Sequence, residues 1–457
     1  MMRNSRLSLR RLAPSAVLLT ALAGCSGDDT DDAHGGGDTE GMHTGDTEAG
    51  SAGSAGSGGT ATSATATDGM DETSGPDSGP DTGPDSGDPT SCIDDEWVCG
   101  TGCCSWSTEI VDADGTVGQR SALAMQSDGT IHVAYRIVSG GDSYYGGVRR
   151  AVGTSGAWTT HEVSFPSGLS GWGISVAVQG DKPWITEYAG STYVNDPDWV
   201  QLHAGPDSGT VAEIDYEWQR SGSVMQVGVT RGGAVEVCYP ALPDQARCVR
   251  RQNNGSFTPS TTFTIQPDED WIYLSGFNLA FALDGSDRWH ALYQHTIKSV
   301  GFFHDLPGVY YAVDGGAPEL VDADADASRL KMALGPDDRP HIAFVQYDGS
   351  SSGEGPVYYG HRGAGGWTLE QVATQATSVA VAVDSQGRPA LAYFHGPSSQ
   401  LRFMYRLGDE WRVDVPDDNP RAGMSPSLMF DDDDVPHLAY YDGTIFVLKY
   451  ATWVRAD

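Results

Sequence analysis

Basic residues are scarce in this chain of 457 residues, which has 27 Lys and Arg against 62 Asp and Glu and a formal net charge of -35. Nucleic acids and anionic lipid surfaces bind proteins mainly through a basic face that displaces counterions or meets acidic headgroups. We therefore expect neither to be the main partner. Polar neutral ligands and divalent cations such as Ca2+ are compatible with this charge, although no metal site and no cofactor is predicted.

Long apolar runs are absent except near the N-terminus. The apolar stretch LAPSAVLLTALAG at residues 12–24 follows a segment with four arginines. It is shorter than the ~20 apolar residues that a membrane-spanning helix needs. A basic start followed by a short apolar core predicts a signal peptide over residues 1–24.

The end of that segment, LAGC at residues 22–25, resembles the lipobox of bacterial lipoproteins. The resemblance implies that the Cys25 thiol receives a diacylglyceryl group and that Cys25 becomes the mature N-terminus. Ser26 rather than Asp follows, which implies placement at the outer membrane or cell surface. Acyl chains bury methylenes at about 0.8 kcal/mol each, so two or three chains anchor a protein to the membrane. The alternative is ordinary signal-peptidase cleavage beside a chance cysteine.

Residues 25–91 contain no Lys or Arg and consist almost entirely of Gly, Ser, Thr, Ala, Pro and acids. Such a segment cannot bury enough apolar surface to offset the entropy lost on ordering. The Gly-Pro-Asp repeat at residues 75–89 stiffens and extends it. We expect a disordered, acidic linker between the lipid and a folded domain.

Cysteines are few, seven in all, and Cys25 accounts for one of them. The remaining even number in an exported protein predicts disulfides. Cys238 and Cys248 flank the segment YPALPDQAR between two predicted strands. A disulfide across this hairpin is expected.

Four further cysteines crowd into residues 92–104, at Cys92, Cys99, Cys103 and Cys104. Adjacent cysteines rarely bond each other, because the small ring strains the peptide. Two connectivities are then open for a two-bridge knot, 92–103 with 99–104 or 92–104 with 99–103. A four-cysteine zinc site is the alternative.

Residues 105–457 repeat one pattern seven times: an apolar strand, a Gly- or Asp-containing turn, and a second strand that ends in an aromatic residue. The clearest copy is SVAVAVDSQGRPALAY at residues 378–393. Aligned positions near the start of each second strand are His132, Trp184, Glu236, His290, His341, Ala390 and His437, spaced by 47 to 54 residues. A period this steady is typical of stacked supersecondary units.

Each repeat is rich in Val, Ile, Tyr and Ala and shows no sustained helical periodicity. A third strand with Tyr, Arg or Lys follows the aromatic residue, and Trp158, Trp367 and Trp411 mark a fourth. This pattern predicts an all-β, seven-bladed β-propeller over residues 105–457, with six or eight blades as counting alternatives and an open solenoid as the other architecture. The repeats resemble those of secreted sialidase-like and lectin-like propellers, and the acid-rich stalk resembles that of myxobacterial lipoproteins.

The first folded segment, SWSTEIVDA at residues 105–113, has the character of a fourth strand. Trp106 precedes His132 by 26 residues, and Trp411 precedes His437 by the same 26. The last repeat has room for only three strands. We therefore predict that the N-terminal strand completes the C-terminal blade and closes the ring, and that the fourth strands of blades two to four are irregular.

No catalytic residue is predicted. HExxH, P-loop and dinucleotide motifs are absent, the sialidase Asp-box is not completed, and GSSSG at residues 349–353 lacks the helix of a nucleophile elbow. His132, His290, His341 and His437 could form a metal or ligand circle. We expect them instead to pack and form hydrogen bonds, and we expect the Asp-rich turn at residues 431–434 to be solvated.

The connections after the second strands are long and aromatic in several repeats. The candidate ligand-binding residues are Tyr144, Tyr145, Tyr193, Trp199, Phe302, Phe303 and His304. Propellers present such loops around a central depression, and exposed aromatic rings suit sugar faces or a partner protein. The prediction is a monomeric surface lipoprotein whose propeller is a binding or interaction module. The alternative is a secreted propeller hydrolase or lyase that acts on polysaccharide.

Overall fold

A computed structural model describes residues 97–99, 102–138, 146–165, 169–190, 198–205, 211–217, 224–241, 245–264, 272–299, 302–347 and 353–455. The predicted signal peptide, Cys25 and the linker at residues 25–91 lie outside the described residues. The described part contains no helix, and therefore none that could cross a membrane.

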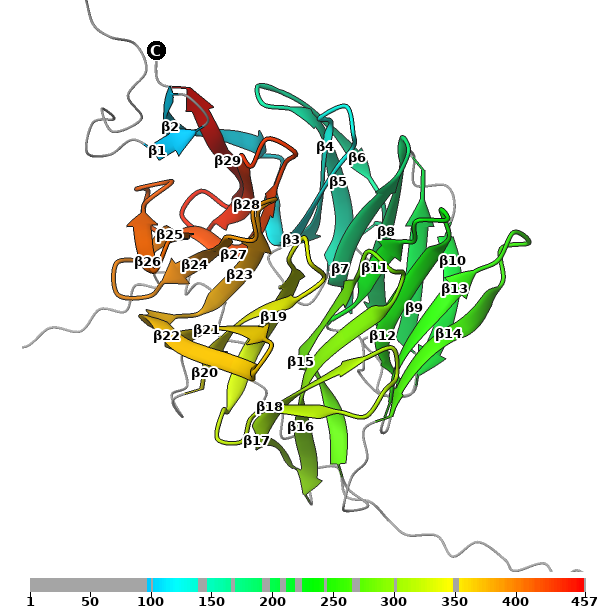
Figure 1. The fold of residues 1–457 in the computed structure, drawn as a ribbon. Coiled ribbons are helices and arrows are strands. Elements are labelled where there is room, and N and C mark those ends of the chain that lie inside the picture. Colours follow the sequence, from blue (N-terminus) through cyan, green and yellow to red (C-terminus); the bar gives the residue numbers. More distant parts are fainter. Residues whose placement is uncertain are drawn as a thin grey trace, which may run out of the picture.

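Seven antiparallel sheets surround a central axis, and each runs from an innermost strand outward (Figure 1). Blade 1 contains β3 (Thr116–Met125), β4 (Ile131–Val138), β5 (Gly146–Thr154) and β6 (Ala157–Glu162). Blade 2 contains β7 (Leu169–Gln179), β8 (Lys182–Gly190), β9 (Asp198–Ala204) and β10 (Val211–Glu217). Blade 3 contains β11 (Gln226–Val229), β12 (Val235–Ala241), β13 (Gln245–Arg251) and β14 (Phe257–Thr264).

The remaining blades continue the same order. Blade 4 contains β15 (Ile272–Leu283), β16 (Trp289–Ser299), β17 (Phe302–Val313) and β18 (Glu319–Asp322). Blade 5 contains β19 (Ala327–Leu334), β20 (Pro340–Gln346), β21 (Gly355–Gly363) and β22 (Gly366–Ala376). Blade 6 contains β23 (Ser378–Val383), β24 (Pro389–His395), β25 (Gln400–Leu407) and β26 (Glu410–Asp414). Blade 7 contains β27 (Ala422–Phe430), β28 (Pro436–Asp442), β29 (Val447–Arg455), β2 (Gly102–Asp112) and β1 (Trp97–Cys99).

The innermost strands contact one another in sequence order, and β27 of blade 7 also contacts β3 of blade 1. This contact closes the circle. The seven-bladed propeller is confirmed, and the open solenoid is excluded. The fourth strands of blades 2 to 4 all pair with their neighbours, although β18 has only 4 residues and the β10–β9 ladder shifts register between Glu213 and Asp215.

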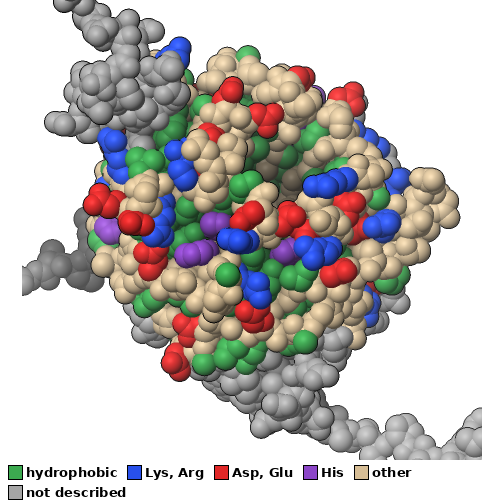
Figure 2. Space-filling view, in the orientation of Figure 1, with side chains coloured by type: hydrophobic (Ala, Val, Ile, Leu, Met, Phe, Trp, Pro, Cys, Tyr) green, Lys and Arg blue, Asp and Glu red, His purple; other side chains and the backbone are tan. Residues whose placement is uncertain are grey.

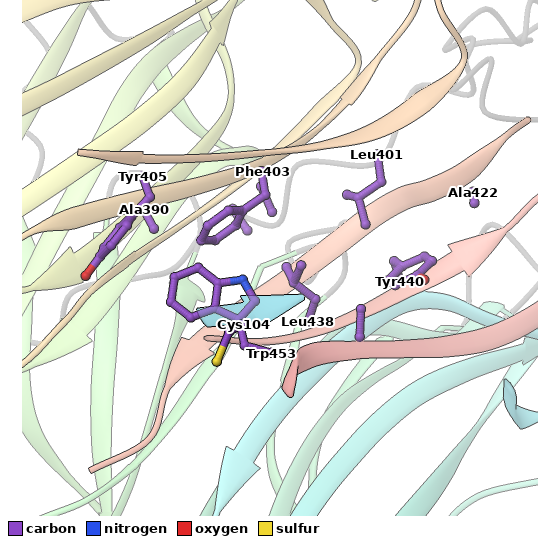
Figure 3. Packing of buried hydrophobic residues seen from close by; sticks show 12 residues of the cluster. Cys104, Ala390, Leu401, Phe403, Tyr405, Ala422, Leu438, Tyr440 and Trp453 are labelled. Carbon is purple, nitrogen blue, oxygen red and sulfur yellow. The ribbon is translucent and has the colours of Figure 1, made fainter. Parts of the chain in front are cut away.

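Strand β2 closes the ring as predicted, because it pairs with the last strand, β29, and Trp106 lies opposite Trp453. The Trp106 ring packs 5.0 Å from that of Phe403 in blade 6, and its Nε1 donates a 2.8 Å hydrogen bond to Asp414. Cys104 of β2 is buried in the same cluster as Trp453 and Phe403 (Figure 3). Strand β2 therefore contributes to the core between blades 6 and 7.

The Trp residues that mark fourth strands pack across blade boundaries in the same way. Trp158 of blade 1 lies 5.2 Å from Tyr450 of blade 7, Trp367 of blade 5 lies 5.2 Å from Tyr311 of blade 4, and Trp411 of blade 6 lies 5.1 Å from Tyr359 of blade 5. All three pairs meet edge to face, an arrangement that aromatic rings favour. This contact explains why the repeat places Trp at its fourth strand.

The Cys238–Cys248 disulfide joins facing residues of β12 and β13, as predicted. Cys103 and Cys104 are also disulfide-bonded, which favours the knot over a zinc site. Cys92 lies outside the described residues, so the connectivity within the knot stays a prediction. The pairing of β1 with β2 places the knot directly on the strand that closes the ring.

A clamp of an Asp, a Tyr and a cation, which the sequence analysis missed, links three pairs of neighbouring blades. It is buried at two of them and partly exposed at the third, which contains Asp215. At the first, the hydroxyl of Tyr135 donates a 2.5 Å hydrogen bond to Asp112 and the Arg149 guanidinium lies 2.8 Å from the same carboxylate. The others combine Asp215 with Tyr239 and Arg247, and Asp417 with Tyr440 and Lys449. In each case an Asp at the outer end of one blade meets a Tyr and a cation of the next blade, and the Asp precedes the Tyr by 23 or 24 residues.

Candidate ligand site in the central channel

The repeated histidines hold neighbouring strands together. His290 Nδ1 lies 2.6 Å from the Tyr311 hydroxyl, and its Nε2 lies 3.1 Å from Asp284. Because a carboxylate can only accept, Nε2 carries the proton and Nδ1 accepts from the tyrosine. His341 and His437 contact Tyr359 and Tyr450 in the same way. No group of three or more metal-ligating side chains occurs in the described part of the chain, and the structural role expected for these histidines matches their contacts.

Burial lowers the pKa of His341 to about 4, and its side chain is neutral in the folded protein at neutral pH. In the unfolded chain its pKa is about 6.5, so the unfolded state binds a proton that the folded state does not bind between pH 6.5 and 4. Stability is therefore fully present above pH 6.5 and falls by up to about 3 kcal/mol as pH drops to 4. We expect His341→Gln to flatten this part of the profile of unfolding free energy against pH, measured by urea unfolding. An unchanged slope would contradict the burial argument.

Carboxylates in the turns between first and second strands accept hydrogen bonds from backbone N–H groups. The Asp431 carboxylate accepts hydrogen bonds from the backbone N–H of Asp433 and Val435, and Asp434 accepts from the backbone N–H of Ser385 in the preceding blade. The turn at residues 431–434 is solvated at Asp432 and Asp433, as expected, whereas Asp431 and Asp434 are half-buried and their carboxylates also satisfy backbone donors. On the face shown in Figure 2, acidic and basic side chains are interspersed, with histidines near the middle.

Two arginines of the innermost strands occupy strained positions. Arg120 of β3 has φ 55 and Arg329 of β19 has φ 57, and each coincides with a register shift against the second strand. A left-handed conformation costs a non-glycine residue about 1–2 kcal/mol. Ser425 of β27 adopts it at the same kind of register shift (φ 49), so the conformation belongs to the repeat. The bulge turns these side chains away from the regular alternation of the strand.

Lys331 follows Arg329 on β19 and pairs with Ala343 of β20. In the other six blades the residue at this register is small or uncharged: Ala122, Ser175, Gln226, Ala280, Ala380 and Ser427. The Lys331 side chain is exposed to solvent, yet the surrounding protein and the charges of Arg329 and Arg120 lower its pKa to about 8. The exposed Lys331 side chain lies on the innermost strand of blade 5.

Arg120 belongs to blade 1 and Lys331 to blade 5, so the electrostatic effect of one on the other acts across the ring. We name Arg120, Arg329 and Lys331 the channel cation cluster. No carboxylate among the described residues forms an ion pair with Lys331 in this structure. The cluster concentrates positive charge in a protein whose formal net charge is -35.

An aromatic platform adjoins the cluster at the boundary of blades 1 and 2. The guanidinium carbon of Arg120 lies 3.8 Å from the ring centroid of Trp172, and that of Arg136 lies 5.2 Å from it. Arg136 also donates a 3.2 Å hydrogen bond to Gln119. Thr116 pairs with Val138, so the start of β3 and the end of β4 lie at the same end of the ring as the β4–β5 connection.

The residues predicted from sequence to bind a ligand are only partly described. Trp199 is half-buried in β9, opposite Ala189 and Tyr216. Phe302, Phe303 and His304 belong to β17 and pair with residues 297–299, so the loop expected there was wrong: the β16–β17 ladder continues through these residues. Tyr144, Tyr145 and Tyr193 lie outside the described residues. For all seven, ligand binding stays a prediction.

Sequence reasoning missed the channel cation cluster and Trp172, although one signal was present. Aligning the seven repeats by their strand register leaves Lys331 as the single charged residue at its position. The repeats align most clearly on the second strand, whose residues are buried, whereas Lys331 lies on the first strand.

No family model and no curated protein matches this chain. Among solved structures, it is similar to the alpha-L-arabinofuranosidase arb93a from Fusarium graminearum, at 12% identity and TM-score 0.40, over 74% of this chain and 93% of that one. It is also similar to the Hadza microbial sialidase Hz136, at 11% identity and TM-score 0.41, over 74% and 65%. An alpha-L-arabinanase from Penicillium chrysogenum aligns at 9% identity and TM-score 0.42, over 76% and 98%. These likenesses concern the propeller fold alone.

Proposed function

We propose that this propeller is a binding module for an acidic glycan, held at the channel cation cluster and at Trp172. The single observation that carries the proposal is Lys331, an exposed lysine on the innermost strand of blade 5 whose pKa is lowered in part by the charges of Arg329 and Arg120, in a strongly acidic protein. Carboxylates and sulfates pair with guanidinium groups through charge-assisted hydrogen bonds. The Trp172 ring packs against the Arg120 guanidinium and holds it in place.

Electrostatics supports an anionic ligand over a neutral one. Bringing a carboxylate to the cluster relieves repulsion among three like charges, whereas a neutral sugar leaves that repulsion in place. The acidic outer surface repels polyanions in general, so the ligand must reach the channel to gain affinity. The proposal therefore predicts selective, salt-sensitive binding.

Replacing Lys331 by Met tests this directly. In the full chain with Cys25→Ser, we expect Lys331→Met to weaken binding of an oligogalacturonate at least tenfold, measured by isothermal titration calorimetry. Loss of one charge-assisted contact is worth about 1.5–3 kcal/mol. The matched control is Lys182→Met, which removes a lysine that lies 4.2 Å from the Trp184 ring. Equal affinities for the two variants would contradict the site.

Cleavage of a bound polysaccharide is the second candidate, and one observation favours it. Glu187 of β8 is a buried carboxylate, one residue from the Tyr188 that pairs with Trp172. It accepts a 2.8 Å hydrogen bond from Ser164 and lies 2.9 Å from His203. Glycosidases use two carboxylates about 5–9.5 Å apart, so Glu187 would need a partner. Release of oligosaccharide from polygalacturonate, abolished by Glu187→Gln, would establish this function in place of binding alone.

We also propose that a lipid on Cys25 anchors the protein at the outer membrane or cell surface, with residues 26–91 as an extended linker. The motif at residues 22–25 and the apolar segment before it support this placement. We expect Cys25→Ser to abolish metabolic labelling with palmitate and to release the chain from the membrane fraction. Persistent labelling would mean that Cys25 is not the acceptor.

A further inference from the structure

The clamp between blades 6 and 7 differs from the other two in its cation. Lys449 of β29 takes the place that Arg149 and Arg247 have in the other clamps, in a chain that contains only four lysines. Lys449 Nζ contacts Asp417 Oδ2 and lies 3.6 Å from Asp442 Oδ2, and the three side chains are 7%, 2% and 2% exposed. A buried amine against a buried carboxyl group can form an amide, whereas arginine does not deprotonate in proteins and cannot react in this way.

We propose that Lys449 Nζ and the Asp417 carboxyl group condense to an isopeptide bond, and that Asp442 carries protons between them. The bond joins the connection between β26 and β27 to the last strand, β29, over 32 residues of sequence. Strand β2 pairs with β29, so the cross-link lies in the blade where the two ends of the ring meet. This modification does not depend on the proposed glycan site, whose residues belong to blades 1, 2 and 5.

Hydrogen bonds hold both oxygens of the Asp417 carboxyl group. Its Oδ1 accepts from the Asn419 backbone N–H at 3.0 Å and from the Asn419 Nδ2 at 2.7 Å, and its Oδ2 accepts from the Tyr440 hydroxyl at 2.8 Å. When Nζ attacks the carboxyl carbon, negative charge grows on Oδ1, and donors already aimed at that oxygen lower the barrier. Burial and the Asp417 charge raise the pKa of Tyr440 well above its usual value, so the hydroxyl stays a donor.

The two groups must exchange protons in order to react. Burial raises the pKa of Asp417, but hydrogen bonds, first of all that from Lys449, lower it by more, so Asp417 is a carboxylate before the reaction and its partner an ammonium. Asp442 takes one proton from Nζ, and the freed lone pair adds to the Asp417 carboxyl carbon. That proton and a second one from Nζ pass through Asp442 to Oδ2, which leaves as water while the new C–N bond remains. Atoms, electrons and charge balance without an oxidant or reductant, and Asp442 ends as the carboxylate it was at the start.

The product leaves less charge inside the protein than the ion pair does. Burying charged groups costs free energy even when they are paired, and the amide is neutral. Proximity favours the reaction as well, because the fold holds the amine and the carboxyl group in contact. Asp442 keeps partners afterwards, since its Oδ1 accepts hydrogen bonds from the backbone N–H groups of Thr444 and Ile445, at 2.9 and 3.3 Å.

Peptide mapping of the full chain with Cys25→Ser tests the bond. After reduction of the disulfides, trypsin cleaves behind arginines but not behind an acylated lysine. The isopeptide therefore yields residues 413–421 joined to residues 422–455, lighter by one water than the two peptides together. We expect mass spectrometry to find most of Lys449 in this branched peptide, and to find no branched peptide in Lys449→Arg, which keeps the positive charge.

The digest of the unsubstituted clamp decides whether the bond exists, whatever a substitution does to folding. Residues 413–421 recovered as a free peptide from that folded protein would show a simple ion pair and overturn the inference. Asp442→Asn should lower the branched fraction at least tenfold, because general acid–base groups typically contribute about 10²–10⁴-fold to a rate. The matched control is Asp433→Asn, at an exposed position of the same blade, which should leave that fraction unchanged. Equal branched fractions in these two variants would remove Asp442 from the reaction.

Discussion

Deletion of residues 92–112, which removes the cysteine knot together with β1 and β2, is expected to lower the free energy of unfolding by at least about 5 kcal/mol. Removing a large aromatic side chain from a core costs about 3–5 kcal/mol, and the half-buried Trp106 packs against both Phe403 and Trp453. The deletion also leaves β29 as an unpaired edge, which invites association with other chains. Deleting the whole cysteine-rich segment avoids stranding an unpaired cysteine.

The measurement combines urea unfolding followed by tryptophan fluorescence with light scattering at increasing protein concentration. A loss of about 5 kcal/mol equals the entire stability of many natural domains, so we expect partial unfolding and aggregation at room temperature. The control is deletion of residues 27–91, which removes only the linker and should change neither quantity. If the 92–112 deletion stays monomeric with an unchanged midpoint, β2 is not what holds the ring closed.

Much of this architecture could be predicted from the sequence, because the residues that specify each blade lie within one repeat. The turn residues, the aromatic residue that ends the second strand and the Trp of the fourth strand act within one blade or between adjacent blades. The interval of 26 residues from Trp106 to His132 also identified residues 105–113 as the fourth strand of the last blade. The paired β2 and β29 confirm that reasoning.

Features that depend on the closed ring could not be predicted in the same way. Arg120 and Lys331 are far apart in sequence and act on each other only because blades 1 and 5 face the same channel. The aromatic residues 302–304 of the β16–β17 hairpin predict a binding loop, because exposed aromatic rings are typical of such loops. The β16–β17 ladder continues through these residues and satisfies their backbone N–H and C=O groups, so they form strand rather than loop.

Replacing Arg149 by Met should strongly destabilise the clamp between blades 7 and 1. Arg149 and Asp112 are 9% and 7% exposed, and Arg149 also contacts Glu162 at 2.6 Å. Removing one partner of a buried ion pair costs about 3–5 kcal/mol, because the other charge stays buried without compensation. The Tyr135 hydroxyl would still donate to Asp112 but cannot neutralise it.

Arg362→Met provides a matched comparison, since Arg362 pairs with Glu319 at 2.9 Å but the two side chains are 44% and 36% exposed. Exposed pairs contribute about 0–1 kcal/mol, so this substitution should have little effect on urea unfolding. Arg149→Met combined with Asp112→Asn should recover much of the loss, because a neutral amide tolerates burial better than an unpaired carboxylate. If Arg149→Met costs no more than Arg362→Met, the clamp does not stabilise the junction where the chain closes on itself.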